Sequence, residues 1–232
     1  MRSLPVTVVL ALFPSLVHAI PCQVGSLQSY IDLGGGGCSI EDKLFSSFLD
    51  LGVVGDAASI VPADILVIPL STPGNPGLTF DLGVSATAGE LLQSLFSFSV
   101  VVLPGGFPIQ AVSSSLSGSR VAPDGANTAL FCLGTNDPTC PAPDTILLFD
   151  IGIDSLLSDS RSLASVAALD LVVDVVVDGG LSGSGSLSSA TIRFREVSAV
   201  PEPATWLSVG VSLLALSRVR RQRRHASKEL AK

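Results

Sequence analysis

Apolar and polar residues alternate along the middle of the chain, and this alternation predicts β-strands. Residues 95–103 read LFSFSVVVL, with phenylalanine and valine on one face and serine on the other. A period of two is typical of a strand with one buried face. Pro104-Gly105-Gly106 ends this segment with a strong turn signal. Similar signals predict strands at Ile65–Ile68, Ile109–Leu116, Thr128–Leu133, Ile146–Ile153, Leu169–Val177 and Leu187–Val197.

The last two of these segments are predicted to pair with each other. Leu169–Val177 is followed by Asp178-Gly179-Gly180 and then by a return segment in which serine and glycine alternate. Aspartate followed by glycine is a sequence that tight hairpin turns prefer. The sequence therefore predicts a β-hairpin here.

One segment, Cys38–Leu51, has a pattern that fits a helix. Its apolar residues have a spacing that fits one face of a helix; they are Ile40, Leu44, Phe45, Phe48 and Leu51. The alternative reading of this segment is the entry to a strand. Elsewhere, short strands separated by Gly, Pro, Asp and Ser predict an all-β chain. The predicted fold is a single β-sandwich, jelly-roll or Greek-key-like, over residues 20–199.

The N-terminus has the order of features found in a secretory signal peptide. Arg2 precedes an apolar run over residues 6–17, and Val17 and Ala19 occupy the −3 and −1 positions of a cleavage site. We therefore expect residues 1–19 to be removed after export through the Sec translocon.

The C-terminus carries three ordered features over residues 200–224. They are a Pro-Glu-Pro motif, an apolar stretch over residues 204–217 and a basic run. The motif consists of Val200, Pro201, Glu202 and Pro203. The basic run contains Arg218, Arg220, Arg221, Arg223 and Arg224. This order resembles the PEP-CTERM sorting signal of Gram-negative bacteria, and the resemblance implies a substrate of exosortase, a membrane-embedded sorting enzyme.

The apolar stretch is short for a membrane span. A helix from Pro203 to Ser217 would be about 22 Å long, against a bilayer core of roughly 30 Å. Trp206 can lie at one interface while the arginines stay on the cytoplasmic side. Residues 225–232 extend the tail beyond the usual end of such signals. The sequence leaves open whether the helix is cleaved off or retained as a permanent anchor.

All four cysteines lie in the predicted exported part of the chain. Proximity favours the pairs Cys22–Cys38 and Cys132–Cys140 among the three pairings that four cysteines allow. A zinc site built from all four is the alternative, but the closely spaced cysteine pairs of zinc sites are missing. The sequence therefore predicts two disulfides and no metal.

The central stretch is itself similar to a recurring class of secreted PEP-CTERM proteins. Its motifs are Cys22, Gly36-Gly37-Cys38-Ser39-Ile40, Asp42-Lys43-Leu44-Phe45 and Asp178-Gly179-Gly180. That class has no assigned activity, so the resemblance implies export without implying a reaction.

Charge and composition exclude several classes of function. The chain has a formal charge of −7, while residues 20–199 hold five Lys or Arg and 18 Asp or Glu, a formal charge of −13. Such acidity argues against nucleic acid and predicts that anionic polymers need bridging cations or uncharged contacts. Residues 20–199 contain no histidine, which excludes Ser-His-Asp and Cys-His catalysis there. No cofactor is expected.

Three motifs invite a chemical interpretation. Asp170, Asp174 and Asp178 recur on one strand face, but about 13 Å separates successive members, too far to hold one calcium ion. Gly34–Gly37 lacks the Lys and Ser/Thr of a phosphate-binding loop. The serine-rich tracts at residues 113–117 and 182–189 are candidates for O-linked sugar or simply for strand surface. We expect a solvated strand face for the aspartates and the serine-rich tracts, and a flexible loop bounded by a disulfide for Gly34–Gly37.

Together these features predict an exported, non-enzymatic matrix or adhesion protein associated with exopolysaccharide or biofilm. It would pass through the inner membrane before exosortase processing and reach the cell surface or the extracellular matrix. Ice-binding proteins with a similar C-terminal signal suggest another kind of surface binding. The alternatives are a permanently anchored envelope protein and a carboxylate-based glycan hydrolase or lyase, which needs two carboxyl groups roughly 5–10 Å apart.

Overall fold

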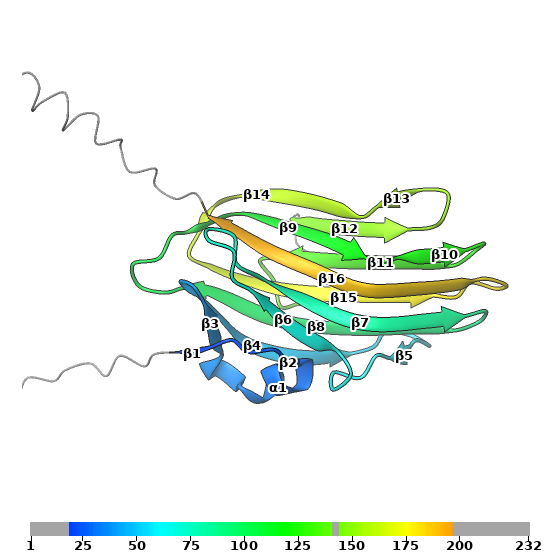
Figure 1. Cartoon of the computed structure of the whole chain (residues 1–232), viewed down its shortest axis with the longest axis horizontal. Coiled ribbons are helices and arrows are strands. Elements are labelled where there is room, and N and C mark those ends of the chain that lie inside the picture. Colours follow the sequence, from blue (N-terminus) through cyan, green and yellow to red (C-terminus); the bar gives the residue numbers. More distant parts are fainter. Residues whose placement is uncertain (1–18, 141–143, 197–232) are drawn as a thin grey trace, which may run out of the picture.

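The computed structural model describes residues 19–140 and 144–196. These residues form two β-sheets that pack face to face, which confirms the all-β prediction (Figure 1). One sheet has nine strands and is named sheet A; the other has seven and is named sheet B. All seven strands expected from the sequence are present.

The spatial order of the strands differs from their order along the chain. From edge to edge, sheet A contains β1 (Ile20–Pro21), β3 (Cys38–Ile40), β4 (Lys43–Gly52), β8 (Leu91–Val102), β15 (Ala168–Asp178), β11 (Ala126–Leu133), β12 (Thr145–Asp150) and β13 (Ser155–Leu156), with β5 (Ala58–Ser59) also paired to β8. Sheet B contains β14 (Ser158–Val166), β9 (Ile109–Ser117), β16 (Ser184–Glu196), β7 (Gly77–Thr87), β6 (Leu66–Leu70) and β2 (Gly25–Ser26), with β10 (Arg120–Ala122) also paired to β16. Helix α1 (Leu27–Asp32) and the 3-10 turn η1 (Gly34–Gly36) precede β3.

Phenylalanine side chains fill the space between the two sheets. Phe98 on β8 lies against Phe45 and Phe48 of sheet A and against Phe80 and Phe194 of sheet B. The ring centroids are 5.1–6.5 Å from that of Phe98, and all five side chains are buried. Burying one such side chain stabilises a fold by about 1.5–3 kcal/mol, and favourable ring pairing adds to this. The aromatic layer is therefore a major source of stability.

The predicted hairpin of residues 169–197 is wrong, because its two strands lie in different sheets. β15 pairs with β8 and β11 in sheet A, whereas β16 pairs with β7, β9 and β10 in sheet B. Both edges of β15 are thus already occupied. Gly179 and Gly180 carry the chain from one sheet to the other. A Cβ atom on Gly179 would lie 1.8 Å from the Thr87 carbonyl oxygen, so only glycine fits this crossing.

The predicted helix over Cys38–Leu51 is also wrong, and the alternative of a strand is confirmed. These residues form β3 and β4. The pairing of β4 with β8 shifts register between Ser46 and Leu49, and Ser47 has a φ of 56°. This β-bulge adds a residue, so Phe45 and Phe48 both face the core although they are three positions apart. The bulge therefore produces an apolar spacing that resembles a helix.

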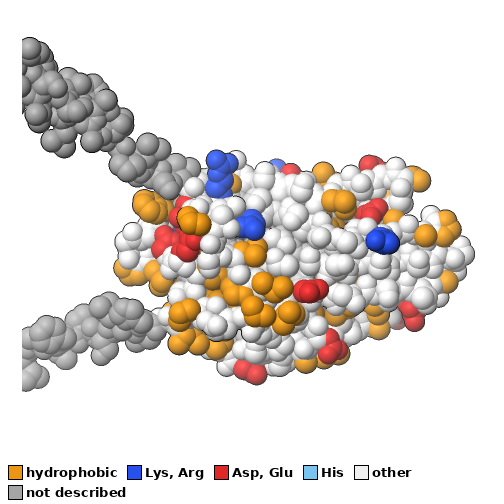
Figure 2. All heavy atoms as spheres, in the orientation of Figure 1, with side chains coloured by type: hydrophobic (Ala, Val, Ile, Leu, Met, Phe, Trp, Pro, Cys, Tyr) orange, Lys and Arg blue, Asp and Glu red, His pale blue; other side chains and the backbone are white. Residues whose placement is uncertain are grey.

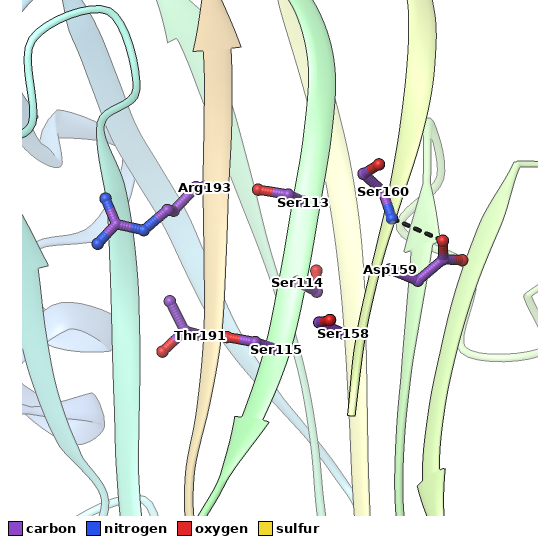
Figure 3. Close-up of a pocket in the computed structure, with 8 residues that line it drawn as sticks. All are labelled: Ser113, Ser114, Ser115, Ser158, Asp159, Ser160, Thr191 and Arg193. Carbon is purple, nitrogen blue, oxygen red and sulfur yellow. Dashed lines mark hydrogen bonds between the residues drawn. The ribbon is translucent and has the colours of Figure 1, made fainter. Parts of the chain in front are cut away.

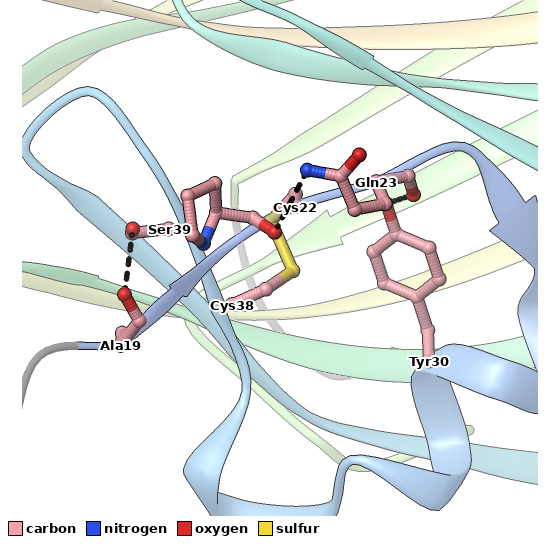
Figure 4. Close-up of a disulfide and its surroundings, with 7 residues drawn as sticks. Ala19, Cys22, Gln23, Tyr30, Cys38 and Ser39 are labelled. Atoms are coloured by element: carbon pink, nitrogen blue, oxygen red, sulfur yellow. Dashed lines mark hydrogen bonds between the residues drawn. A yellow bond between two sulfur atoms is a disulfide. The ribbon is translucent and has the colours of Figure 1, made fainter.

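Both predicted disulfides form. Cys22–Cys38 ties the segment before α1 to β3, and the chain between them includes η1 (Figure 4). Beside this bond, Tyr30 donates a hydrogen bond to the Gln23 carbonyl oxygen at 2.6 Å, and burial raises the pKa of Tyr30 to about 12. A cross-link closing a loop of this length contributes about 3 kcal/mol by restricting the unfolded chain.

The outer face of sheet A is partly covered by its own loops. Cys132–Cys140 folds the segment after β11 over this face, where Leu95 and Val172 form a small buried cluster with Cys132. The segment after β4 also lies here, since Gln93 accepts a hydrogen bond from the Val54 amide at 2.7 Å. No comparable apolar cluster forms on the outer face of sheet B within residues 19–140 and 144–196. Sheet B is therefore the open face.

Replacing Phe98 with alanine tests the aromatic layer. We expect Phe98→Ala to lower the free energy of unfolding by about 3–5 kcal/mol, because it removes the ring on which both sheets pack. The matched control is Phe107→Ala, since the Phe107 side chain is 42% exposed. The control is expected to cost less than about 1 kcal/mol. Urea unfolding measures both, and equal losses would contradict the central role of Phe98.

Candidate functional site

The residues of the predicted sorting signal lie outside the described part of the chain. This applies to Val200, Pro201, Glu202 and Pro203 and to the arginines from Arg218 to Arg224. Val17 of the predicted cleavage site is outside as well, while Ala19 is the first described residue. Within residues 19–140 and 144–196, no helix is long and apolar enough to cross a membrane. The predicted signal peptide and C-terminal helix stay predictions.

The two ends of the folded part lie at the same end of the sandwich. β1 and the last residues of β16 both lie at the left in Figure 1. β1 pairs with β3, which precedes Lys43, and Lys43 contacts Glu196 at the end of β16. Pro201 follows Glu196 by only five positions. The Pro-Glu-Pro motif therefore follows directly on the folded sandwich.

A buried ion cluster fixes this end of the sandwich. Lys43 has no exposed side-chain surface, and its ammonium group contacts a carboxylate oxygen of Asp42 and one of Glu196. Its third partner is the Phe107 carbonyl oxygen at 2.8 Å. Because β4 belongs to sheet A and β16 to sheet B, the cluster joins the two sheets where the chain leaves toward the motif.

The two carboxylates in this cluster have opposite pKa shifts. Burial raises the pKa of Asp42, but its hydrogen bonds with Glu196, Lys43 and the Phe107 amide outweigh burial, so the pKa is lowered. Burial raises the pKa of Glu196, and so does the neighbouring Asp42, while Lys43 opposes both only in part. One cation thus serves two carboxylates. We interpret this group as a structural tie, because all three side chains are occupied by one another.

The open face of sheet B presents rows of hydroxyl groups. Along β9, serines point outward between the buried residues Val112, Ser114 and Leu116. Strand registers align them with hydroxyls on neighbouring strands. One row across the sheet consists of Ser158, Ser115, Thr191 and Thr79, and the next consists of Ser160, Ser113 and Arg193. Neighbouring members of a row are about 4.8 Å apart, and the rows are about 7 Å apart.

These rows form a shallow groove with a volume of about 430 Å³. It is lined by Ser113, Ser114, Ser115, Ser158, Asp159, Ser160, Thr191 and Arg193 (Figure 3). Arg193 extends from β16 toward the segment before β7, where it donates hydrogen bonds to the Thr72 hydroxyl at 3.0 Å and the Asn75 carbonyl oxygen at 3.3 Å. Asp159 is the one carboxylate in the lining. Such a surface can hydrogen-bond a polar chain lying along the strands.

Figure 2 looks directly onto this face. Uncharged side chains and backbone cover most of it, with separate groups of Lys and Arg atoms over β16 and β10. An apolar patch lies over β6, whose outward residues Leu66, Ile68 and Leu70 are partly exposed. The face is broad and shallow, with no deep cavity visible in this view.

The aspartates of β15 do not converge on one ligand. Asp170 accepts a hydrogen bond from Ser99 at 2.6 Å, Asp174 from Gln93 at 2.7 Å, and Asp178 from the Gly180 amide at 2.7 Å. Burial raises the pKa of Asp174, and the hydrogen bond from Gln93 opposes that rise. No group of three His, Cys, Asp or Glu residues suited to a metal ion occurs in the described residues. Each aspartate therefore has a separate local partner.

A second depression, of about 510 Å³, contains the remaining grouped acids. It lies where β7 meets β8 and where β15 meets β16, and Glu90, Asp124 and Asp178 line it. Glu90 accepts hydrogen bonds from the Thr87 amide and hydroxyl, and Asp124 accepts them from Ser182 and the Leu181 amide. These carboxylates hold the turns together.

The sequence predicts only part of the open face. The serines of residues 113–117 were recognised as strand surface, but Thr79 and Ser158 lie on strands that the sequence did not predict. For Thr79 a signal existed, since Leu78, Phe80 and Leu82 alternate with polar residues in β7. β14 reads SDSRSLASV and has no such alternation.

Comparison with known proteins identifies the C-terminal segment. Residues 199–224 match the family described as the PEP-CTERM protein-sorting motif. The match confirms the resemblance found in the sequence, and the segment is consistent with a substrate of exosortase. No curated protein matches the chain significantly.

Two solved structures illustrate how distant the structural similarities are. TmCBM61 in complex with beta-1,4-galactotriose is 14% identical with a TM-score of 0.28, and the match covers 75% of this chain and 100% of that chain. Arabinose-bound MgGH51 α-L-arabinofuranosidase is 12% identical with a TM-score of 0.26, and the match covers 76% of this chain and 26% of that chain. TM-scores this low do not establish a shared topology.

Replacing Lys43 with methionine tests the buried ion cluster. We expect Lys43→Met to lower the free energy of unfolding by about 3–5 kcal/mol, because it leaves two carboxylates without their cation. Adding Glu196→Gln should restore part of that loss. Urea unfolding of the two single variants and the double variant gives the coupling energy. Additive losses would show that Lys43 and Glu196 do not stabilise one another.

Replacing Asp174 with asparagine tests the half-buried acid on sheet A. A carboxyl group with a raised pKa in the folded state favours folding when protonated, so this stability is lost as the pH rises past its ordinary pKa of 3.8. Asn can still accept the hydrogen bond from Gln93. We therefore expect Asp174→Asn to unfold at higher urea than the unchanged protein at about pH 7, with the difference disappearing near pH 3. Asp170→Asn, at an exposed position of the same strand, is the control.

Proposed function

We propose that this protein is an exported, non-enzymatic component of the cell surface or extracellular matrix, and that the open face of sheet B contacts exopolysaccharide. The chain carries a PEP-CTERM sorting motif at residues 199–224, which implies an exported protein that transits the membrane. The observation that carries the proposal is the hydroxyl-lined outer face of sheet B, over which the described residues form no covering loop. Polysaccharides present mainly hydroxyl groups, and a flat polar surface can hydrogen-bond them over a long contact.

The position of the two described chain ends supports this function. Because both described ends leave from one end of the sandwich, the broad faces point sideways from a membrane-held intermediate (Figure 1). Sheet B would then remain accessible before and after processing. Release at the Pro-Glu-Pro motif would free the folded sandwich while leaving its buried ion cluster, which ends at Glu196, complete.

The arrangement of acids favours a binding role over catalysis. A carboxylate-based hydrolase or lyase needs two carboxyl groups directed at one substrate bond. Asp159 is the only carboxylate among the residues that line the groove on sheet B. In the second depression, Glu90, Asp124 and Asp178 accept hydrogen bonds from nearby turn residues. We therefore assign these acids to the structure of the turns and not to chemistry on a glycan.

The first test is the intact mass of the native protein in the culture medium and in the membrane fraction. We expect a released species that begins at Ile20 and ends near Pro201–Pro203. Replacing Pro201, Glu202 and Pro203 together with alanine should keep the protein in the membrane fraction. Lys228→Ala with Glu229→Ala, in the tail extension, is the control and should leave release unchanged. A native protein that keeps its arginine tail in the membrane would instead indicate a permanent anchor.

A further inference from the structure

The charges of the sandwich are segregated between its two sheets. All four arginines of the described residues, Arg120, Arg161, Arg193 and Arg195, lie on strands of sheet B. The strands of sheet B hold three acids, whereas those of sheet A hold five acids and one cation, the buried Lys43. Residues 20–199 are strongly acidic overall, but the strands of sheet B are not acidic.

None of these arginines is paired with a carboxylate in the described part of the chain. Both ion pairs found there involve Lys43. Arg193 donates only to the neutral oxygens of Thr72 and Asn75, and Arg161 only to the Thr145 carbonyl oxygen. They stay without an ion pair although residues 20–199 hold 18 carboxylates. Guanidinium groups left without an anion favour an anionic ligand from outside.

From this we infer that the groove lined by Arg193, together with Arg195 beside it on β16, binds an acidic polysaccharide, a specificity that rests on the function proposed above. Arg193 and Arg195 are two positions apart on β16, so both point outward, about 7 Å apart. Arg193 is oriented by hydrogen bonds through one nitrogen, Nη1, and its fork can still donate to a carboxylate. The adjacent hydroxyls of Ser113 and Ser160 suit the hydroxyls of the same sugar chain.

The overall charge does not prevent this binding. The sequence predicted that an anionic polymer would need bridging cations, because residues 20–199 carry −13. Stacked sheets are about 10 Å apart, and the Debye length is about 8 Å at physiological ionic strength. A ligand on sheet B is therefore largely screened from the aspartates on the far side of sheet A. Beside the ligand, Arg193 and Arg195 outnumber Asp159, the one carboxylate in the groove lining.

An acidic glycan fits this face better than an anionic membrane does. A lipid surface presents phosphate charges to the arginines but offers little to the rows of serine and threonine between them. The hydroxyl rows run along the broad side of the sandwich, across β14, β9, β16 and β7. A linear polymer can follow these strands and use both kinds of group.

Binding to alginate, a polymer of uronic acids, tests the inference. The protein purified from its own cells is compared on alginate, on carboxyl-reduced alginate and on vesicles containing phosphatidylglycerol. We expect the unchanged protein to bind alginate more tightly than carboxyl-reduced alginate or the vesicles. Its affinity for alginate should fall as salt is added. Arg193→Gln with Arg195→Gln should weaken alginate binding at least about tenfold. Arg120→Gln with Arg161→Gln changes the net charge equally and should weaken it less than about threefold.

The outcomes separate this inference from the proposed function. Equal binding of alginate and its carboxyl-reduced form overturns the acidic specificity while leaving polysaccharide binding intact. No binding to alginate, to its reduced form or to the exopolysaccharide of the producing cells overturns both. Arginine-dependent binding to vesicles without binding to alginate also overturns the inference. If the double variant unfolds, Arg195→Gln alone replaces it in the test. Arg195 is exposed and makes no hydrogen bond to described residues, so this variant should fold. It too must weaken alginate binding.

Discussion

Burial of the aromatic layer around Phe98 is the interaction on which the rest of the structure depends. Rings from β4 and β8 of sheet A meet rings from β7 and β16 of sheet B at that residue. The layer fixes which face of each strand is inside, so it also decides which side chains point to solvent. The serines of β9 and the arginines of β16 point outward because their neighbours Val112 and Phe194 are buried in the core.

Polar ties within this apolar space fix the two sheets relative to each other. Lys43 joins β4 to Glu196 on β16 at the end from which the chain leaves. Asn127, fully buried on β11, donates hydrogen bonds to the Ser186 carbonyl oxygen at 2.7 Å and to the Ser119 hydroxyl at 2.8 Å. Dispersion forces alone tolerate small slips between sheets, whereas a buried charge or amide must keep its partners. These ties therefore hold the alignment of β16 with sheet A.

The two outer faces differ for a physical reason that bears on function. On sheet A, the Cys132–Cys140 loop and the segment after β4 cover apolar side chains such as Leu95 and Val172. On sheet B the outward side chains of β9 and β16 are mainly serine, threonine and arginine, which need no cover. The acids lie mainly on sheet A and in turns. The sandwich thus has one face closed by its own loops and one that is polar, open and locally not acidic.

The sequence by itself determined what local signals encode: the alternating strands such as residues 95–103, the nearby cysteine pairs and the ordered C-terminal sorting motif. It could not determine features that depend on distant partners. A bulge at Ser47 gave β4 the spacing of a helix, and the crossing at Gly179 separated two strands that local turn chemistry would join. Tertiary structure also decided that the arginines gather on sheet B, because the sheet that a strand enters depends on which edges remain free. Counting the charges along the sequence therefore does not show on which sheet they lie.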